Sequence, residues 1–179
     1  QGSTWQPAAR IDGLFWANIF FYRGAAYLMG TEKHHGRIVA MRSVDGGQTW
    51  STPTDTRDGI LTADGMYHTA PMPMVIHNGR IWRAFEDAMG GTRWGSRYRA
   101  MIMSAPIDAD LLQSASWTFS NQLPGNPAWL DGTFGGWLEG NAIVDPDGAI
   151  VNLLRVACPK GGKAALVRVR ADGKQVHFD

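Results

Sequence analysis

The stretch Ser43–Trp50 is the feature that most constrains the fold of this chain, because it follows the pattern Ser-x-Asp-x-Gly-x-Thr-Trp. The side chain of Asp45 can accept hydrogen bonds from the backbone N–H groups that follow it. Gly46 and Gly47 allow the positive φ angles that a tight hairpin needs. We expect Trp50 to begin the return strand and to fold its ring back over the turn. The pattern therefore predicts a β-hairpin closed by a buttressed turn.

The same order of elements recurs three times along the 179 residues. In each unit two apolar runs flank a turn that contains glycine, an arrangement that favours β-hairpins. The hairpins are expected at 14–29, 68–85 and 137–154, and the strands that follow them at 37–43, 98–105 and 164–170. One helical turn is expected over 106–112, and a degenerate copy of the Asp45 turn at Asp172–Gly173. No segment has a sustained 3.6-residue apolar period, so the chain is predicted to be nearly all β.

The Ser43–Trp50 pattern resembles an Asp-box, the BNR-repeat motif of sialidase-like β-propellers. The resemblance implies a propeller of four-stranded antiparallel blades, and we expect about three blades, at 11–60, 65–120 and 133–179. Three blades do not close a ring in the usual way. We therefore expect part of a larger, six-bladed ring, completed by further chain or by self-association, and the start at Gln1 suggests a fragment or a processed form.

Composition excludes several classes of partner. Basic and acidic residues are nearly balanced, 17 against 16, and the basic ones are scattered, so no nucleic-acid partner is predicted. No apolar run approaches the roughly 20 residues that a membrane span needs. Cys158 is alone and cannot form an intrachain disulfide. No spacing resembles a zinc or calcium motif, and no metal or cofactor is predicted.

Polar side chains gather at one end of the predicted blades, where inner strands start and the loops between second and third strands lie. Histidine there suits proton transfer near neutral pH, and tryptophan can stack on a sugar ring. The catalytic candidates are Glu139, His35 and His68, and the substrate-binding candidates are Arg155, Tyr67, Glu86, Asn141, Trp137 and His34. The same loops carry Arg93 and Arg97.

The order of Glu139, the turn Asp145–Gly148 and Arg155 resembles a sialidase blade. In that family the Glu is the base partner of a Tyr nucleophile and the Arg binds the substrate carboxylate, which suits the bidentate geometry of arginine. The first blade departs from the family. Phe15–Asn18 stands in place of its Arg-Ile-Pro element, and Glu32–Gly36 in place of the loop with the acid/base Asp.

The resemblance implies a secreted or periplasmic sialidase-like glycoside hydrolase that acts on terminal sugars of glycans or polysaccharides. Two alternatives stay open. A propeller polysaccharide lyase would act on uronic-acid glycans, with an arginine neutralising the carboxylate and a histidine or tyrosine taking the α-proton. A non-catalytic glycan-binding propeller would explain the departures in the first blade.

Overall fold

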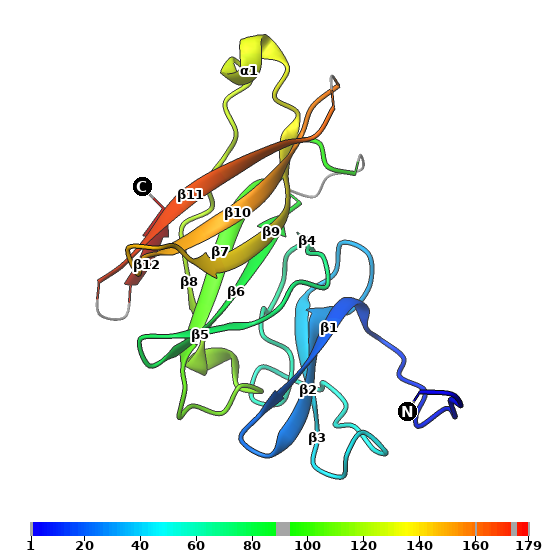
Figure 1. The fold of residues 1–179 in the computed structure, drawn as a ribbon. Coiled ribbons are helices and arrows are strands. Elements are labelled where there is room, and N and C mark those ends of the chain that lie inside the picture. Colours follow the sequence, from blue (N-terminus) through cyan, green and yellow to red (C-terminus); the bar gives the residue numbers. More distant parts are fainter. Residues whose placement is uncertain (1, 89–93, 160, 173–174, 179) are drawn as a thin grey trace.

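The computed structural model describes residues 2–88, 94–159, 161–172 and 175–178. Its strands form three antiparallel sheets that follow one another in chain order, from the blue N-terminal sheet to the orange and red C-terminal sheet in Figure 1. Helical structure in the described ranges is limited to α1 (Trp129–Gly132) and one 3-10 turn (Ser114–Ser116). The nearly all-β fold predicted from the sequence is confirmed. No described helix has the length and apolarity that crossing a membrane requires.

The first sheet has the order β1-β2-β3. Its strands are β1 (Phe15–Tyr22), β2 (Ala25–Thr31) and β3 (Ile38–Ser43). The return strand expected after Trp50 does not form, so that prediction is wrong. Instead an irregular segment forms hydrogen bonds with the backbone groups on the outer edge of β3. Ser51 N–H donates to Arg42 O at 2.9 Å, and Ala40 N–H donates to Gly59 O at 2.8 Å. Pro53 lies within this segment and has no N–H to donate to a ladder.

The turn after β3 has the hydrogen bonds that the sequence predicts. Asp45 Oδ1 accepts from the N–H groups of Gln48 and Thr49, each at 3.0 Å, and Oδ2 accepts from Thr49 Oγ1 at 2.6 Å. These bonds, that from the Thr49 hydroxyl first, hold the pKa of Asp45 well below its usual range. Gly46 and Gly47 have φ angles of 75° and 93°. Trp50 Nε1 donates to Gly47 O at 3.0 Å, which folds the indole back over the turn.

The second sheet has the order β4-β6-β7-β8, and β5 also pairs with β6. Its strands are β4 (Tyr67–His68), β5 (Val75–His77), β6 (Arg80–Asp87), β7 (Arg99–Pro106) and β8 (Thr118–Phe119). The strand expected over 68–76 is broken, because Pro71 and Pro73 have no N–H to donate to a ladder, and carbonyls of the broken segment instead accept hydrogen bonds from the fully buried Arg83. Arg83 Nη2 donates to Ala70 O at 2.6 Å and Nη1 donates to Met72 O. The segment 106–112 forms turns, and the 3-10 turn follows it.

The third sheet has the order β9-β10-β11-β12. Its strands are β9 (Gly136–Val144), β10 (Ile150–Ala157), β11 (Lys163–Asp172) and β12 (Gln175–Phe178). The turn expected near residue 173 lies partly outside the described residues. One apolar core, with Phe85 and Met103, lies between the first and second sheets, and another, with Trp82 and Leu154, between the second and third. The sheets are therefore packed face to face like consecutive blades.

Candidate functional site

Side chains from all three sheets converge where β1, β4 and β9 begin. Three non-glycine residues there have positive φ angles: Trp16 (49°), His35 (54°) and Glu139 (53°). Such backbone costs about 1–3 kcal/mol per residue and persists only where the surroundings impose it. Strain of this kind concentrates at functional sites, so the backbone supports a site at this end of the sheets.

A buried His–Glu pair lies at the base of this cluster. His68 is 2% exposed and Glu86 is fully buried. His68 Nδ1–H donates to Glu86 Oε2 at 2.8 Å, and Glu86 Oε1 accepts from Gly140 N–H at 2.7 Å. Trp94 Nε1–H donates to His68 Nε2 at 3.3 Å. Because a carboxylate only accepts and an indole N–H only donates, both bonds select the neutral His68 tautomer with its proton on Nδ1.

A second histidine pairs with a tyrosine above it. His35 Nε2 is hydrogen-bonded to the hydroxyl of Tyr98, and the ring of His34 stacks on that of His35 at 4.0 Å between centroids. Burial, followed by the neighbouring His34 and His68, lowers the pKa of His35. Burial also raises the pKa of Tyr98. The neutral imidazole therefore accepts a hydrogen bond from the protonated phenol, an arrangement suited to proton transfer.

An ion pair forms the third part of the cluster. Arg155 Nη1 donates to Glu139 Oε1 at 2.8 Å, and both side chains keep contact with solvent. The Arg155 guanidinium lies 5.5 Å from the centre of the Trp94 ring. Since Trp94 also donates to His68, it connects the ion pair to the buried pair. Contacts thus run without a break from Arg155 on the third sheet, through the second, to His35 on the first.

The structure brings together six of the nine predicted residues: Glu139, Arg155, His68, Glu86, His35 and His34. The other three lie beside the cluster. The ring of Tyr67 lies over Gly65, and its backbone N–H donates to Gly36 O at 2.9 Å. Trp137 is buried against Phe134 at 4.8 Å between ring centroids. Asn141 has its Oδ1 buried without a partner among the described residues.

Sequence reasoning missed the role of Tyr98. It was expected only as the first residue of a strand, whereas its ring lies 5.5 Å from that of His35 and 5.3 Å from that of His68. The available signal was its position at the end of a loop between second and third strands. Trp16 is 41% exposed and lies 5.8 Å from the His68 ring, so it can present an aromatic face to a ligand. Arg93 lies outside the described residues.

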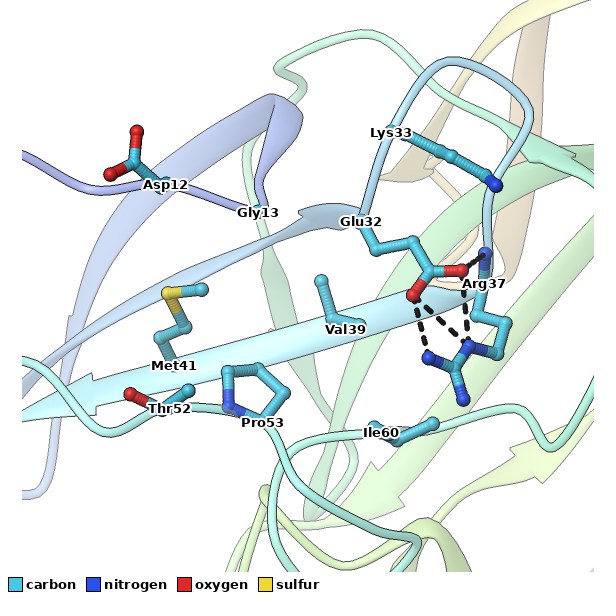
Figure 2. A pocket seen from close by; sticks show the side chains of 10 residues that line it. All are labelled: Asp12, Gly13, Glu32, Lys33, Arg37, Val39, Met41, Thr52, Pro53 and Ile60. Carbon is cyan, nitrogen blue, oxygen red and sulfur yellow. Dashed lines mark hydrogen bonds and ion pairs between the residues drawn. The ribbon is translucent and has the colours of Figure 1, made fainter.

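A hollow of about 500 Å³ lies on the outer side of β3, away from this cluster. Figure 2 shows Glu32 turned towards Arg37, with Nη2 donating to Oε2 at 2.7 Å, above a floor of Val39 and Met41. That ion pair resembles the pair of Glu139 with Arg155, but no histidine or aromatic ring is among the described residues that line the hollow. Within the described ranges, no group of three or more His, Cys, Asp or Glu side chains is placed to hold a metal ion.

Comparisons with known proteins identify the fold. No protein-family model and no curated protein sequence matches the chain. Solved structures do match it, among them an α-L-arabinofuranosidase from Lactobacillus brevis, with a TM-score of 0.53, 13% identity, and coverage of 89% of this chain and 53% of that one. A Trypanosoma rangeli sialidase in complex with the inhibitor DANA matches with a TM-score of 0.54, 15% identity, and coverage of 94% and 30%. An endo-1,4-beta-xylanase from Bacteroides thetaiotaomicron matches with a TM-score of 0.56, 12% identity, and coverage of 100% and 62%.

The three packed sheets and these similarities define the class: the chain is a partial β-propeller with the fold that sialidases and family-43 glycoside hydrolases share. The similarity is wider than the sialidase resemblance in the sequence, because it includes arabinan- and xylan-cleaving enzymes. The chain spans between about a third and three fifths of the length of these proteins.

Proposed function

We propose that the chain forms part of the active site of a glycan-cleaving propeller enzyme, a glycoside hydrolase of the sialidase-like type. One observation carries this proposal: a continuous set of contacts from Arg155 to His35 joins titratable side chains of all three sheets at the end where the inner strands begin. The fold supports it, since the similar solved structures include an arabinofuranosidase, an arabinanase, a xylanase and a sialidase.

In this proposal the Glu139–Arg155 pair faces the substrate. Arg155 orients an anionic or hydroxyl-rich sugar by donating hydrogen bonds, and Trp94 and Trp16 stack on its apolar face. The Glu139 carboxylate, held by Arg155, activates the attacking group. His68 is positioned by Glu86 in one tautomer, and His35 with Tyr98 supplies a proton donor and acceptor. The remaining groups of a hydrolase site belong to parts of the ring beyond this chain.

The experiment uses the protein that contains this chain, with a panel of neutral, uronate-containing and sialylated polysaccharides. New reducing ends without ultraviolet absorbance are expected with at least one substrate. If the folded protein retains oligosaccharides on an array but releases no sugar from any substrate, it is a binding module and the enzymatic proposal is wrong.

β-Elimination from a uronic acid is a second candidate, which the bond between His35 and Tyr98 favours. In that reaction the base takes the proton α to the carboxylate, the C–O bond to the leaving sugar breaks, and a C=C bond forms. The leaving oxygen receives a proton, and Arg155 neutralises the carboxylate. Glu86 cannot serve as the second free carboxylate of a hydrolase, because both of its oxygens accept buried bonds. An unsaturated product absorbing in the ultraviolet identifies this reaction.

A further inference from the structure

A second hollow, of about 360 Å³, lies between the second and third sheets, on the far side of Gly135 from Trp94. Its described lining carries two arginines and no carboxylate, over an apolar floor; the residues used below are Arg97, Arg99, Gln122, Pro124, Pro127 and Phe134. A smaller hollow that contains Trp94 shares Gly135 with it. The hollow with the two arginines therefore adjoins the one that contains Trp94, and the Arg155 guanidinium lies 5.5 Å from the centre of the Trp94 ring.

The charge of this hollow comes from Arg97. Arg99 is balanced by Asp87, since its Nε donates to Asp87 Oδ2 at 2.8 Å. Arg97 is exposed, and among the described side chains no carboxylate lies within ion-pair distance of it. A guanidinium without a carboxylate partner, beside apolar surface, suits an anionic oxygen group.

The walls of the hollow are held rigidly. The N–H of Arg97 donates to Gly135 O at 3.0 Å, and the left-handed φ of 62° sets the direction in which its Cα–Cβ bond leaves the backbone. Leu123 exchanges two backbone hydrogen bonds with Ala100, at 2.8 and 3.0 Å, which anchors the rim that carries Gln122 and Pro124. Phe134 packs so closely over Gly125 that a Cβ there would lie 1.9 Å from its ring. The backbone and the apolar walls of the hollow are therefore preformed, which lowers the ordering cost of binding.

We propose that this hollow is a second sugar subsite, which binds an anionic substituent, carboxylate or sulfate, on a residue of the glycan distant from the one at Arg155. The inference rests on the proposed function and narrows its substrate class to anionic polysaccharides. The substrate lies across Trp94, with one sugar at Arg155 and a later one between Arg97 and Phe134. Arg97 acts in binding and takes no part in bond cleavage.

Titration calorimetry of the full protein tests this subsite with three probes: uronate oligosaccharides, the same oligosaccharides with reduced carboxyl groups, and sulfated oligosaccharides of a neutral sugar. Arg97→Gln is compared with Arg57→Gln, which removes an exposed arginine on the first sheet's outer loop. We expect Arg97→Gln to weaken binding of at least one anionic probe about tenfold, consistent with one partly exposed charged hydrogen bond. The probe whose affinity for the variant falls shows whether the subsite binds carboxylate or sulfate.

The carboxyl-reduced probe and the Arg57→Gln variant should show no change. The subsite is refuted if Arg97→Gln and the parent bind both anionic probes with equal affinity. It is also refuted if Arg97→Gln loses as much affinity for the carboxyl-reduced probe as for the anionic ones. If the parent still cleaves glycans in that case, only the subsite is wrong. If the parent neither binds nor cleaves any glycan, the proposed function fails with it.

Discussion

Replacing Glu86 by Gln tests how the site positions His68. The carboxylate accepts from His68 Nδ1 at 2.8 Å and from Gly140 N–H at 2.7 Å, whereas an amide has one accepting oxygen and one donating nitrogen. If the amide nitrogen faces Gly140, two donors meet. If it faces His68, the imidazole must move its proton to Nε2, where it opposes the indole N–H of Trp94. One buried hydrogen bond is lost in either orientation.

A lost buried hydrogen bond of this kind costs about 1–3 kcal/mol in the free energy of unfolding. The nitrogen chemical shifts of the His68 imidazole are expected to show the Nδ1–H tautomer in the parent and the Nε2–H tautomer, or a mixture, in the variant. If the proposed hydrolase activity holds, we also expect kcat of the full protein to fall about 100-fold, the lower end of what general acid–base groups contribute. Asp55→Asn, at an exposed ion pair with Arg57 and away from the histidines, is the control. An unchanged tautomer together with an unchanged unfolding free energy would refute the reasoning.

Three further predictions concern other parts of the fold. Burial lowers the pKa of His35 in the folded protein, so the unfolded chain takes up a proton at this histidine before the folded one does. The free energy of unfolding should therefore be highest above pH 6.5 and fall as the pH drops below that value. In urea unfolding, His35→Gln should flatten this pH dependence. Arg83→Met leaves the carbonyls of Ala70 and Met72 without their donor and should lower the unfolding free energy by about 2–5 kcal/mol, whereas an unchanged denaturation midpoint would contradict the account of the broken strand. Asp45→Ala should lower the melting temperature more than Asp45→Asn, with turnover retained in both; a loss of turnover would place this turn at the site.

Local chemistry made much of the fold predictable. The hairpin turns near Gly24, Gly79 and Gly148 depend on neighbouring residues, and the structure has strands on both sides of each. The break in the strand over 68–76 was predictable from Pro71 and Pro73, which have no N–H to donate to a ladder. The hydrogen bonds by which Arg83, on the partner strand, holds the broken segment were not. The missing return strand after Trp50 depends likewise on how the later segment around Gly59 meets β3.

The location of the candidate site was predictable from the sequence, but the pairing of its side chains was not. Strand direction indicates the end of the sheets at which polar residues gather, and the sequence therefore predicts that Glu139, Arg155 and His68 lie together. The pairing of His35 with Tyr98 was not predictable, because 63 residues separate the partners and only the packing of two sheets joins them. Trp137 was named for sugar binding but lies in the core, since periodicity does not distinguish a buried indole from an exposed one.

The central claim is that catalysis takes place at the cluster containing Glu139 and not at the outer hollow beside β3. Turnover by Glu139→Ala and by Glu32→Ala, measured on the same glycan substrate, tests this directly, because each variant removes one partly exposed carboxylate from an arginine. We expect Glu139→Ala to abolish turnover with the fold intact by circular dichroism, and Glu32→Ala to retain it. Full activity of Glu139→Ala, or loss of turnover only in Glu32→Ala, would contradict the account.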